Sequence, residues 1–355
     1  MFNKLHLLSW TLLVAITQVR GQCMITRRNI EQANGVYTFT DRSNNIQLLR
    51  TANVASGALI TLRCRQNEVY RTTCQRNRRF RPALPVNCRN PRNVPDVSPL
   101  PHTDRACPTL MYVVGHTFNN RMLELYRTCY NPQTVRAYFS DVTLYPKTIS
   151  PTRPNVRFTT DQLITPAQAS SYLTRNIFRT FGRIYGQNQQ YIRNNRDLVI
   201  NRGHLTASSD FLFGDQAAGT FKYLNVVPQF QSINDGNWRF IEEWVRTQIP
   251  SNSVLNVRTG ALGVLSLADS SSRRTLRQAY LAGPNQNPVP TWMYKIVRDA
   301  TNRPLHAFIT YNNVFVRARP RQPANCQTPI PCPLNLRNTA AMGYTYCCDP
   351  ATFTI

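Results

Sequence analysis

Lysine is nearly absent from this sequence, and acidic residues are scarce. Only four of the 42 basic residues are lysines, which leaves 38 arginines against 17 aspartates and glutamates. The formal net charge of +25 exceeds what solubility requires and indicates a polyanionic partner: nucleic acid, an anionic glycan or an acidic membrane. Arginine favours phosphate, because its planar guanidinium donates two parallel hydrogen bonds. Since arginine stays charged at high pH, this composition would also suit an alkaline compartment such as a gut lumen.

Long apolar runs are missing after the N-terminus, which argues against stable membrane association. No basic amphipathic helix stands out either, so a cationic membrane-active protein is disfavoured. Residues 1–21 predict a secretory signal peptide, because Lys4 precedes a mostly apolar stretch and small residues precede a cut before Gln22. We therefore expect a secreted, extracellular protein. No Asn-x-Ser/Thr acceptor is present, so N-glycosylation is not expected.

The cysteines show no zinc-binding spacing. No Cys-x-x-Cys pair with a matching distal pair occurs, whereas all ten cysteines lie beyond residue 21. An even number of cysteines in a secreted chain predicts a disulfide framework, whose connectivity the sequence leaves open. The ten are Cys23, Cys64, Cys74, Cys88, Cys107, Cys129, Cys326, Cys332, Cys347 and Cys348.

Composition divides the remaining chain into three parts. Residues 22–90 hold four cysteines and short alternating runs at 36–40 and 58–62, which predict a small disulfide-held β-module. Its basic stretch, residues 71–81, either contacts nucleic acid or forms a solvated hairpin. Residues 91–104 are rich in proline and predict a linker. The module could widen a binding groove, act as a removable propeptide or assist folding.

Residues 105–355 predict an α+β domain. Strand-like runs occupy 111–114, 122–129, 134–144 and 198–200, and further runs lie within 254–267, 292–297 and 307–311. A helix is expected to begin at Thr165-Pro166, with the threonine as N-cap and an apolar stripe at Ala169, Leu173, Ile177 and Phe181. The order shows no βαβ rhythm, so α+β is favoured over a parallel α/β fold.

Three short segments carry candidate chemistry. Residues 201–204 read Asn-Arg-Gly-His directly after an apolar strand, where a following loop could expose His204. Residues 225–229 read Asn-Val-Val-Pro-Gln, and residues 234–238 read Asn-Asp-Gly-Asn-Trp. Helical spacing from Asn234 places Trp238 and Glu242 on one broad face and Glu243 on the opposite one. The alternative is an ordinary amphipathic helix with both glutamates in solvent.

Residues 198–246 closely resemble the DNA/RNA non-specific endonuclease family, the ββα-metal nucleases. The family signature is Asp-Arg-Gly-His, then Asn-x-x-Pro-Gln, then Asn-x-Gly-x-Trp with a downstream glutamate, and all three elements are found here at fitting spacing. Weaker similarity extends over 107–312. The cysteine-rich, two-part layout resembles the arthropod branch, with its digestive double-stranded RNases and crustacean duplex-preferring nucleases. The resemblance implies a ββα-metal nuclease domain with mixed or antiparallel sheets and flanking helices.

The resemblance also implies site roles. His204 would be the general base that activates water, a role that suits a neutral imidazole whose pKa lies near neutrality. Asn234 would be the direct protein ligand of a divalent cation, Mg²⁺ or alternatively Mn²⁺, which keeps several waters. Glu242 would hold metal-bound waters. Arg136 would contact phosphate, although it could equally be one of many surface arginines. Supporting and orienting roles fall to Arg202, Asn225 and Gln229.

One position departs from the family pattern, because Asn201 stands where the family usually has aspartate. If that aspartate only fixes the backbone by hydrogen bonding, asparagine can replace it, and we favour this interpretation. The sequence therefore predicts a secreted Mg²⁺-dependent endonuclease that cuts DNA, RNA or both, double-stranded RNA included, with low sequence specificity. The alternative is a catalytically silent, secreted nucleic-acid-binding protein. Nothing in the sequence indicates an oligomeric state.

Overall fold

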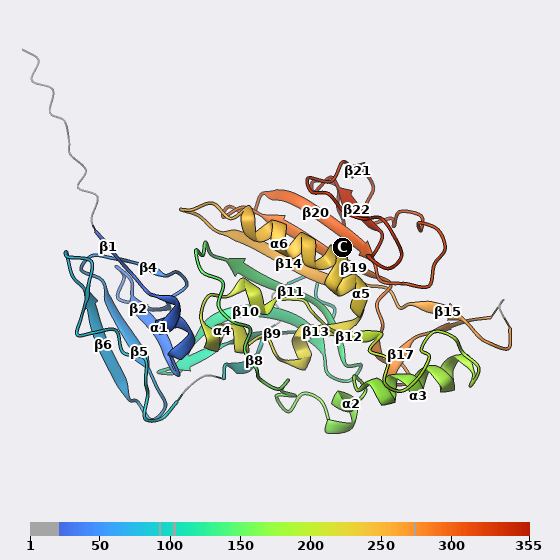
Figure 1. The fold of residues 1–355 in the computed structure, drawn as a ribbon, viewed down its shortest axis with the longest axis horizontal. Helices are drawn as coiled ribbons and strands as arrows, with labels where there is room; N and C mark the ends of the chain where they lie inside the picture. Colours follow the sequence, from blue (N-terminus) through green and yellow to red (C-terminus); the bar gives the residue numbers. More distant parts are fainter. Residues whose placement is uncertain (1–20, 92–93, 102–103, 273–274) are drawn as a thin grey trace, which may run out of the picture.

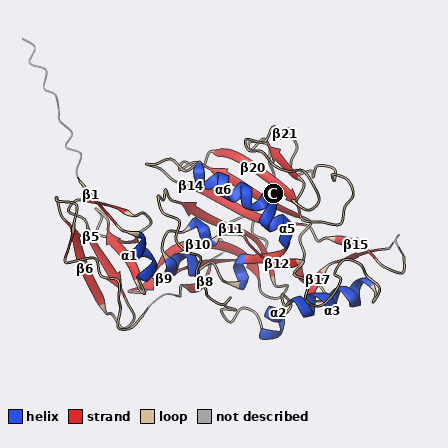
Figure 2. Ribbon diagram, in the orientation of Figure 1, coloured by secondary structure: helices blue, strands red, loops and turns tan. Residues whose placement is uncertain are grey.

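The computed structural model describes residues 21–91, 94–101, 104–272 and 275–355 (Figure 1). The predicted signal peptide therefore lies outside the described residues, apart from Gly21. Within the described ranges, no helix combines the length with the apolarity that a bilayer crossing requires. Strands predominate and helices are few and short (Figure 2).

The N-terminal module, residues 22–90, is built around a five-stranded antiparallel sheet in the order β3-β2-β5-β6-β7. The predicted strands are confirmed, one at its predicted bounds and the other shifted by one residue. The basic stretch 71–81 forms β6, a turn and β7, with its arginines exposed. The elements of the module are β1 (Gln22–Met24), α1 (Arg27–Gln32), β2 (Val36–Thr40), β3 (Ile46–Leu48), β4 (Asn53–Ala55), β5 (Leu59–Arg63), β6 (Val69–Cys74) and β7 (Phe80–Arg81).

A nine-stranded antiparallel sheet forms the centre of the rest of the chain, which confirms the α+β class. The strand predicted at 134–144 begins at Arg136, because Val135 adopts a positive φ of 51° in the preceding turn. Across the sheet the order is β21 (Pro329–Ile330), β22 (Thr345–Cys348), β20 (Pro304–Tyr311), β19 (Trp292–Arg298), β14 (Leu255–Leu262), β11 (Arg136–Leu144), β10 (Arg121–Asn131), β9 (Leu110–Phe118) and β8 (Asp96–Leu100).

The predicted linker, residues 91–104, contains strand β8. This strand pairs with β9 at the edge of the large sheet, where Pro99 lies opposite Tyr112. Proline cannot donate a ladder hydrogen bond, and an edge strand tolerates this because one of its sides has no neighbouring strand. Proline content alone therefore concealed a strand within the linker. The division into 22–90 and 105–355 stays a prediction.

The helix predicted from Thr165 is two helices, α2 (Pro166–Ser170) and α3 (Thr174–Tyr185). Thr165 caps α2 with Pro166 in its first turn, as predicted. The chain breaks at Ser171, whose hydroxyl donates to the carbonyl of Gln168 and accepts from Asn287. Leu173 consequently adopts extended backbone angles and is 39% exposed, so it does not belong to an apolar stripe.

The helix α5 (Gln231–Ile233), the π-turn η3 (Asn234–Trp238) and α6 (Arg239–Thr247) follow one another and lie across the large sheet (Figure 1). Trp238 and Ile241 are fully buried in the main core together with Met293 and Phe308 of the sheet. Smaller elements complete the fold: β12 (Ile200–His204) with β13 (Val226–Phe230), β15 (Ser266–Ala268) with β16 (Leu276–Gln278), β17 (Tyr280–Gly283) with β18 (Gln286–Pro288), η1 (Ser208–Asp210), α4 (Gly214–Ala218) and η2 (Tyr223–Asn225).

All ten cysteines lie in the described ranges and form five disulfides, which confirms the predicted framework. Every bridge is local, with partners 15 to 51 residues apart. No bridge therefore joins the N-terminal module to the rest of the chain. The pairs are Cys23–Cys74, Cys64–Cys88, Cys107–Cys129, Cys326–Cys348 and Cys332–Cys347.

Candidate active site

His204 is the last residue of β12 and lies opposite Val226 of β13. The strand predicted at 198–200 in fact begins at Ile200 and includes the whole Asn-Arg-Gly-His segment, whereas Leu198 is 49% exposed. The predicted strand bounds were therefore wrong, although His204 does stand at the end of the strand, as expected. Apolar content suggested the strand's position, but pairing with β13 determines its bounds.

Three neighbours fix the backbone around His204. A Cβ at Gly203 would lie 2.2 Å from Oε1 of Gln229, so the close packing of β12 on β13 requires glycine there. Asn225 is fully buried; its Nδ2 donates to the carbonyls of Thr206 and Thr220, and its Oδ1 accepts from the amide of Thr206. Asn225 thus holds the chain that leaves His204, which is consistent with its predicted supporting role.

The imidazole of His204 lies among aromatic rings, 5.4 Å from Phe158 and 5.2 Å from Phe221 between ring centroids. Desolvation lowers its pKa to about 3, and the positive charges of Arg153 and Arg202 lower it further. Because the lowered pKa favours the neutral form, His204 can accept a proton at every pH well above 3. The Arg202 guanidinium is held over the rings of Phe158, Tyr172 and Tyr223.

The π-turn changes how the helix presents its side chains. Gly236 has non-helical angles (φ −93°, ψ −128°), and Trp238 is turned fully into the core. Asn234 and Glu242 nevertheless line one cleft, as predicted. Glu243 lines it too, exposed at the rim and paired with Arg239 at 3.0 Å, so its predicted position on the opposite face was wrong. An ideal helical projection fails here because the wider turn shifts the register of the faces.

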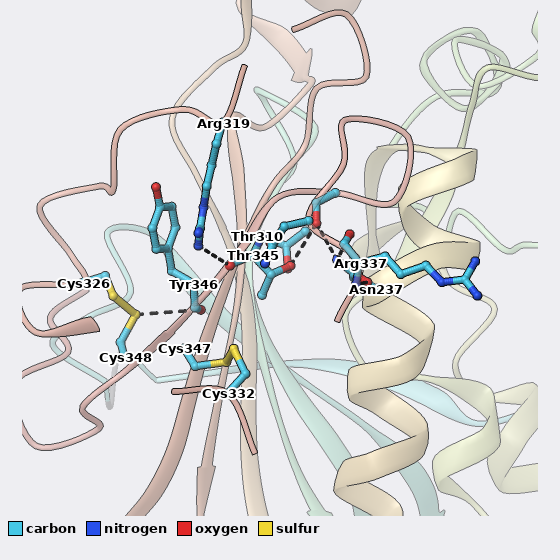
Figure 3. Close-up of a disulfide and its surroundings, with 12 residues drawn as sticks. Asn237, Thr310, Arg319, Cys326, Cys332, Arg337, Thr345, Tyr346, Cys347 and Cys348 are labelled. Carbon is cyan, nitrogen blue, oxygen red and sulfur yellow. Dashed lines mark hydrogen bonds between the residues drawn. A yellow bond between two sulfur atoms is a disulfide. The ribbon is translucent and has the colours of Figure 1, made fainter. Parts of the chain in front are cut away.

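A clamp from the C-terminal segment holds the π-turn (Figure 3). Nδ2 of the buried Asn237 donates to the carbonyls of Arg337 (2.9 Å) and Gly343 (2.7 Å), and its Oδ1 accepts from the amide of Arg337. The Asn237 amide donates to the carbonyl of Met342. The Cys332–Cys347 disulfide closes the loop that carries these partners. Sequence analysis missed Asn237, because its partners lie about 100 residues away.

Glu242 is enclosed on α6. Desolvation raises its carboxyl pKa to about 7, against the opposing influence of Lys295. Lys295 is itself buried, donates to Thr259 Oγ1 and lies 5.2 Å from the ring of Trp238. A further cation in the cleft would therefore favour the ionised form of Glu242.

The cleft has a volume of about 680 Å³ and brings His204, Asn234 and Glu242 together from β12, η3 and α6. Four cationic side chains also line it: Lys147, Arg153, Arg239 and Arg246. Sequence analysis missed all four. Only Arg246 could have been predicted from the sequence, since it lies four residues after Glu242 and helical spacing places the two side chains next to each other.

Arg136 does not line this cleft. Its guanidinium lies 4.6 Å from the ring centroid of Tyr138, and the residue borders a small depression with residues 226–228 of β13. Arg153, in the segment between β11 and α2, is the arginine beside His204. Arg136 therefore lies outside the cleft, and its predicted phosphate contact stays a prediction.

A divalent cation fits the donors of the cleft only if water completes its coordination. Among the described residues, no group of three or more His, Cys, Asp or Glu side chains could hold a metal. The cleft instead offers the amide of Asn234 and the enclosed carboxyl of Glu242. This sparse oxygen set suits Mg²⁺, which keeps several waters, and not Zn²⁺, which prefers four nitrogen or sulfur ligands.

A sequence profile of the family described as DNA/RNA non-specific endonuclease matches residues 108–353. The chain is similar to a salivary endonuclease of Lutzomyia longipalpis (33% identity over 138 residues, 39% of this chain and 32% of the relative). It is also similar to salivary protein Tsal1 of Glossina morsitans morsitans (24%, covering 52% and 48%) and to mitochondrial nuclease EXOG of Danio rerio (32%, covering 27% and 28%). The chain thus spans half or less of these curated relatives.

Proposed function

Because the chain belongs to the DNA/RNA non-specific endonuclease family, we propose that it is a divalent-cation-dependent endonuclease that hydrolyses phosphodiester bonds in DNA, RNA or both. One observation carries this proposal: His204, Asn234 and Glu242 come from three elements and line one cleft whose walls add four cations. A protein that only binds polyanions needs the cations but neither a neutral imidazole nor an enclosed carboxyl. The family relationship and the cleft geometry therefore support catalysis.

The residues of the cleft divide the chemistry among them. Neutral His204 accepts the proton of the attacking water. Its lowered pKa keeps the imidazole unprotonated at pH 7, and it also makes the imidazole a weaker base than one with a pKa near neutrality. Arg153 and Arg246 bind non-bridging phosphate oxygens, and Arg153 also keeps His204 unprotonated. Asn234 would hold Mg²⁺ directly and Glu242 would hold it through water, and the bound ion would stabilise charge on the phosphate and the leaving oxygen.

Substrate range and location follow from the same features. Binding through phosphate is salt-sensitive and carries no base information, so sequence specificity is low and double-stranded RNA is included among the substrates. Five disulfides support an oxidising, extracellular location, as do the salivary relatives.

Purified residues 22–355 are expected to cut double-stranded RNA, double-stranded DNA and single-stranded DNA in the presence of Mg²⁺ and to cut none of them in EDTA. Gel analysis of end-labelled substrates with time measures this, and re-addition of Mg²⁺ after EDTA is the control. If the protein binds all three substrates and cuts none with Mg²⁺, the alternative of a silent nucleic-acid-binding protein holds.

An Asn201→Asp substitution is expected to change kcat/KM at pH 7 by no more than about twofold, the size of a roughly 0.5 kcal/mol effect. Residues 201 and 204 point to opposite faces of β12, because side chains alternate along a strand. A new carboxylate would raise the pKa of His204, but from about 3 the imidazole would still be neutral at pH 7. A pH–rate profile of both proteins tests this, and a gain above tenfold would show that asparagine limits the activity.

A further inference from the structure

The N-terminal module contacts the two segments that form one wall of the cleft. These wall segments are residues 147–154 and 207–211, which supply Lys147, Arg153 and Phe211 to the cleft lining. We propose that the module is a permanent part of the active site, in which Glu31 is a positioning residue that holds Arg153 in place; this rests on the proposed function. Neither a removable propeptide nor a transient folding aid fits the contacts described below.

Apolar contact joins the second wall segment to the module. Leu212 and Phe213 directly follow Phe211, are 2% and 1% exposed, and belong to the hydrophobic core of the module. The rings of Phe213 and Tyr37 lie 5.5 Å apart. Ile149 of the first wall segment packs against the same core. Loss of the module would therefore expose large apolar side chains on both segments.

A buried polar contact reinforces this junction. The Arg50 guanidinium of the module lies near the rings of Tyr145 (5.4 Å) and Phe211 (5.8 Å) and donates to the carbonyl of Glu124. In return, Nε2 of Gln216 donates to the carbonyl of Leu49 at 2.8 Å. Removal of the module would leave Gln216, which is 1% exposed here, without this partner.

Helix α1 of the module forms hydrogen bonds with Thr152, the residue before Arg153. Oε1 of Glu31 accepts hydrogen bonds from the amide and the hydroxyl of Thr152, at 3.2 and 3.1 Å. Nη2 of Arg27 donates to the carbonyl of Ser150 at 2.9 Å. These bonds hold the backbone on the N-terminal side of Arg153, whose guanidinium lies 5.2 Å from the ring centroid of Phe221. They therefore favour the backbone path from which this guanidinium reaches the cleft.

Glu31→Ala tests the positioning role through the salt dependence of binding to a DNA duplex, measured in EDTA so that no cutting is needed. We expect weaker binding by roughly three- to tenfold at low salt and a log–log salt slope smaller by about one, the loss of one phosphate contact. The substitution removes a negative charge, so a charge effect alone would strengthen binding to a polyanion. Glu31→Gln loses the same charge but keeps the acceptor oxygen, so it should bind at least as tightly as the wild type with an unchanged salt slope.

Two comparisons complete this experiment. Arg153→Ala should reproduce the change in slope, and the Glu31→Ala/Arg153→Ala double variant should bind no more weakly than Arg153→Ala alone, because both remove one interaction. Gln32→Ala, on the same helix, is the neutral control. An unchanged slope in Glu31→Ala, or additive losses in the double variant, would overturn the positioning role. The binding readout remains valid even if the wild type proves to cut nothing.

Permanence is tested by cutting the chain between the two parts. A protease site inserted between Asn90 and the exposed Pro91 separates the module from the remainder without breaking a disulfide, since no bridge crosses this point. The two fragments are expected to elute together in size-exclusion chromatography and to bind duplex as the intact chain does. Dissociation of the module with duplex binding unchanged would overturn the proposal.

Discussion

Replacing His204 by alanine is expected to lower kcat by roughly 10²- to 10⁴-fold, the usual contribution of a general base. Substrate binding should persist, because the proposed phosphate contacts come from arginines and not from His204. The imidazole is held neutral among Phe158 and Phe221 and faces the same cleft as Asn234 and Glu242. Single-turnover cutting and duplex binding, measured side by side with Mg²⁺, separate the two effects.

His306→Ala is the matched control for this substitution. His306 also has a pKa lowered by burial, but it lies on β20 against the ring of Trp244 and does not line the cleft. Its replacement should leave kcat within about threefold of the wild type. An equal loss in both variants would mean that imidazole burial matters for folding and that another group is the base.

Replacing Asn237 by alanine is expected to lower the free energy of unfolding by about 3 kcal/mol. It should also raise the Mg²⁺ concentration at which activity is half-maximal. The substitution removes three hydrogen bonds to the C-terminal segment and leaves the Arg337 amide without its partner. Since Asn237 lies within the π-turn that begins at Asn234, freeing this turn should also change the direction of the Asn234 side chain, the proposed metal ligand. Urea unfolding measures the first effect, and Mg²⁺ titration of both activity and melting temperature measures the second.

Asn256→Ala separates lost hydrogen bonds from lost positioning. Asn256 on β14 also makes three side-chain hydrogen bonds, to Thr143, Asp299 and Asn302, but it lies outside the cleft. It should lower stability without changing the midpoint of the Mg²⁺ titration. If Asn237→Ala likewise leaves that midpoint unchanged, the C-terminal clamp only stabilises the fold.

Local sequence patterns were enough to predict several parts of the fold. Strand β2, the capped start of α2 and the even cysteine count were all readable, because alternation, capping and disulfide pairing depend on residues close in sequence or on simple parity. Strand β8 was not, because its proline-rich sequence is typical of a linker until an edge position makes it tolerable. The break at Ser171 depends on Asn287, 116 residues away.

The site likewise contains residues that the sequence predicted and residues that it did not. His204, Asn234 and Glu242 followed from a three-part motif, and the cleft brings them together. Arg153 could not be selected among 38 arginines, because the conformation of the segment between β11 and α2 decides that it reaches the cleft. Glu243 was misplaced since a regular helix was assumed where Gly236 makes a wider turn.

The clamp on Asn237 has a consequence for biosynthesis. Its partners lie between residues 337 and 343, and the disulfide that closes their loop needs Cys347. These residues are synthesised about 100 residues or more after His204, and after Glu242 as well. A nascent chain therefore carries its catalytic groups before the helix that orients the metal ligand is tied down. Such an order of assembly would delay the proposed activity until the C-terminal segment has folded and the Cys332–Cys347 disulfide has formed.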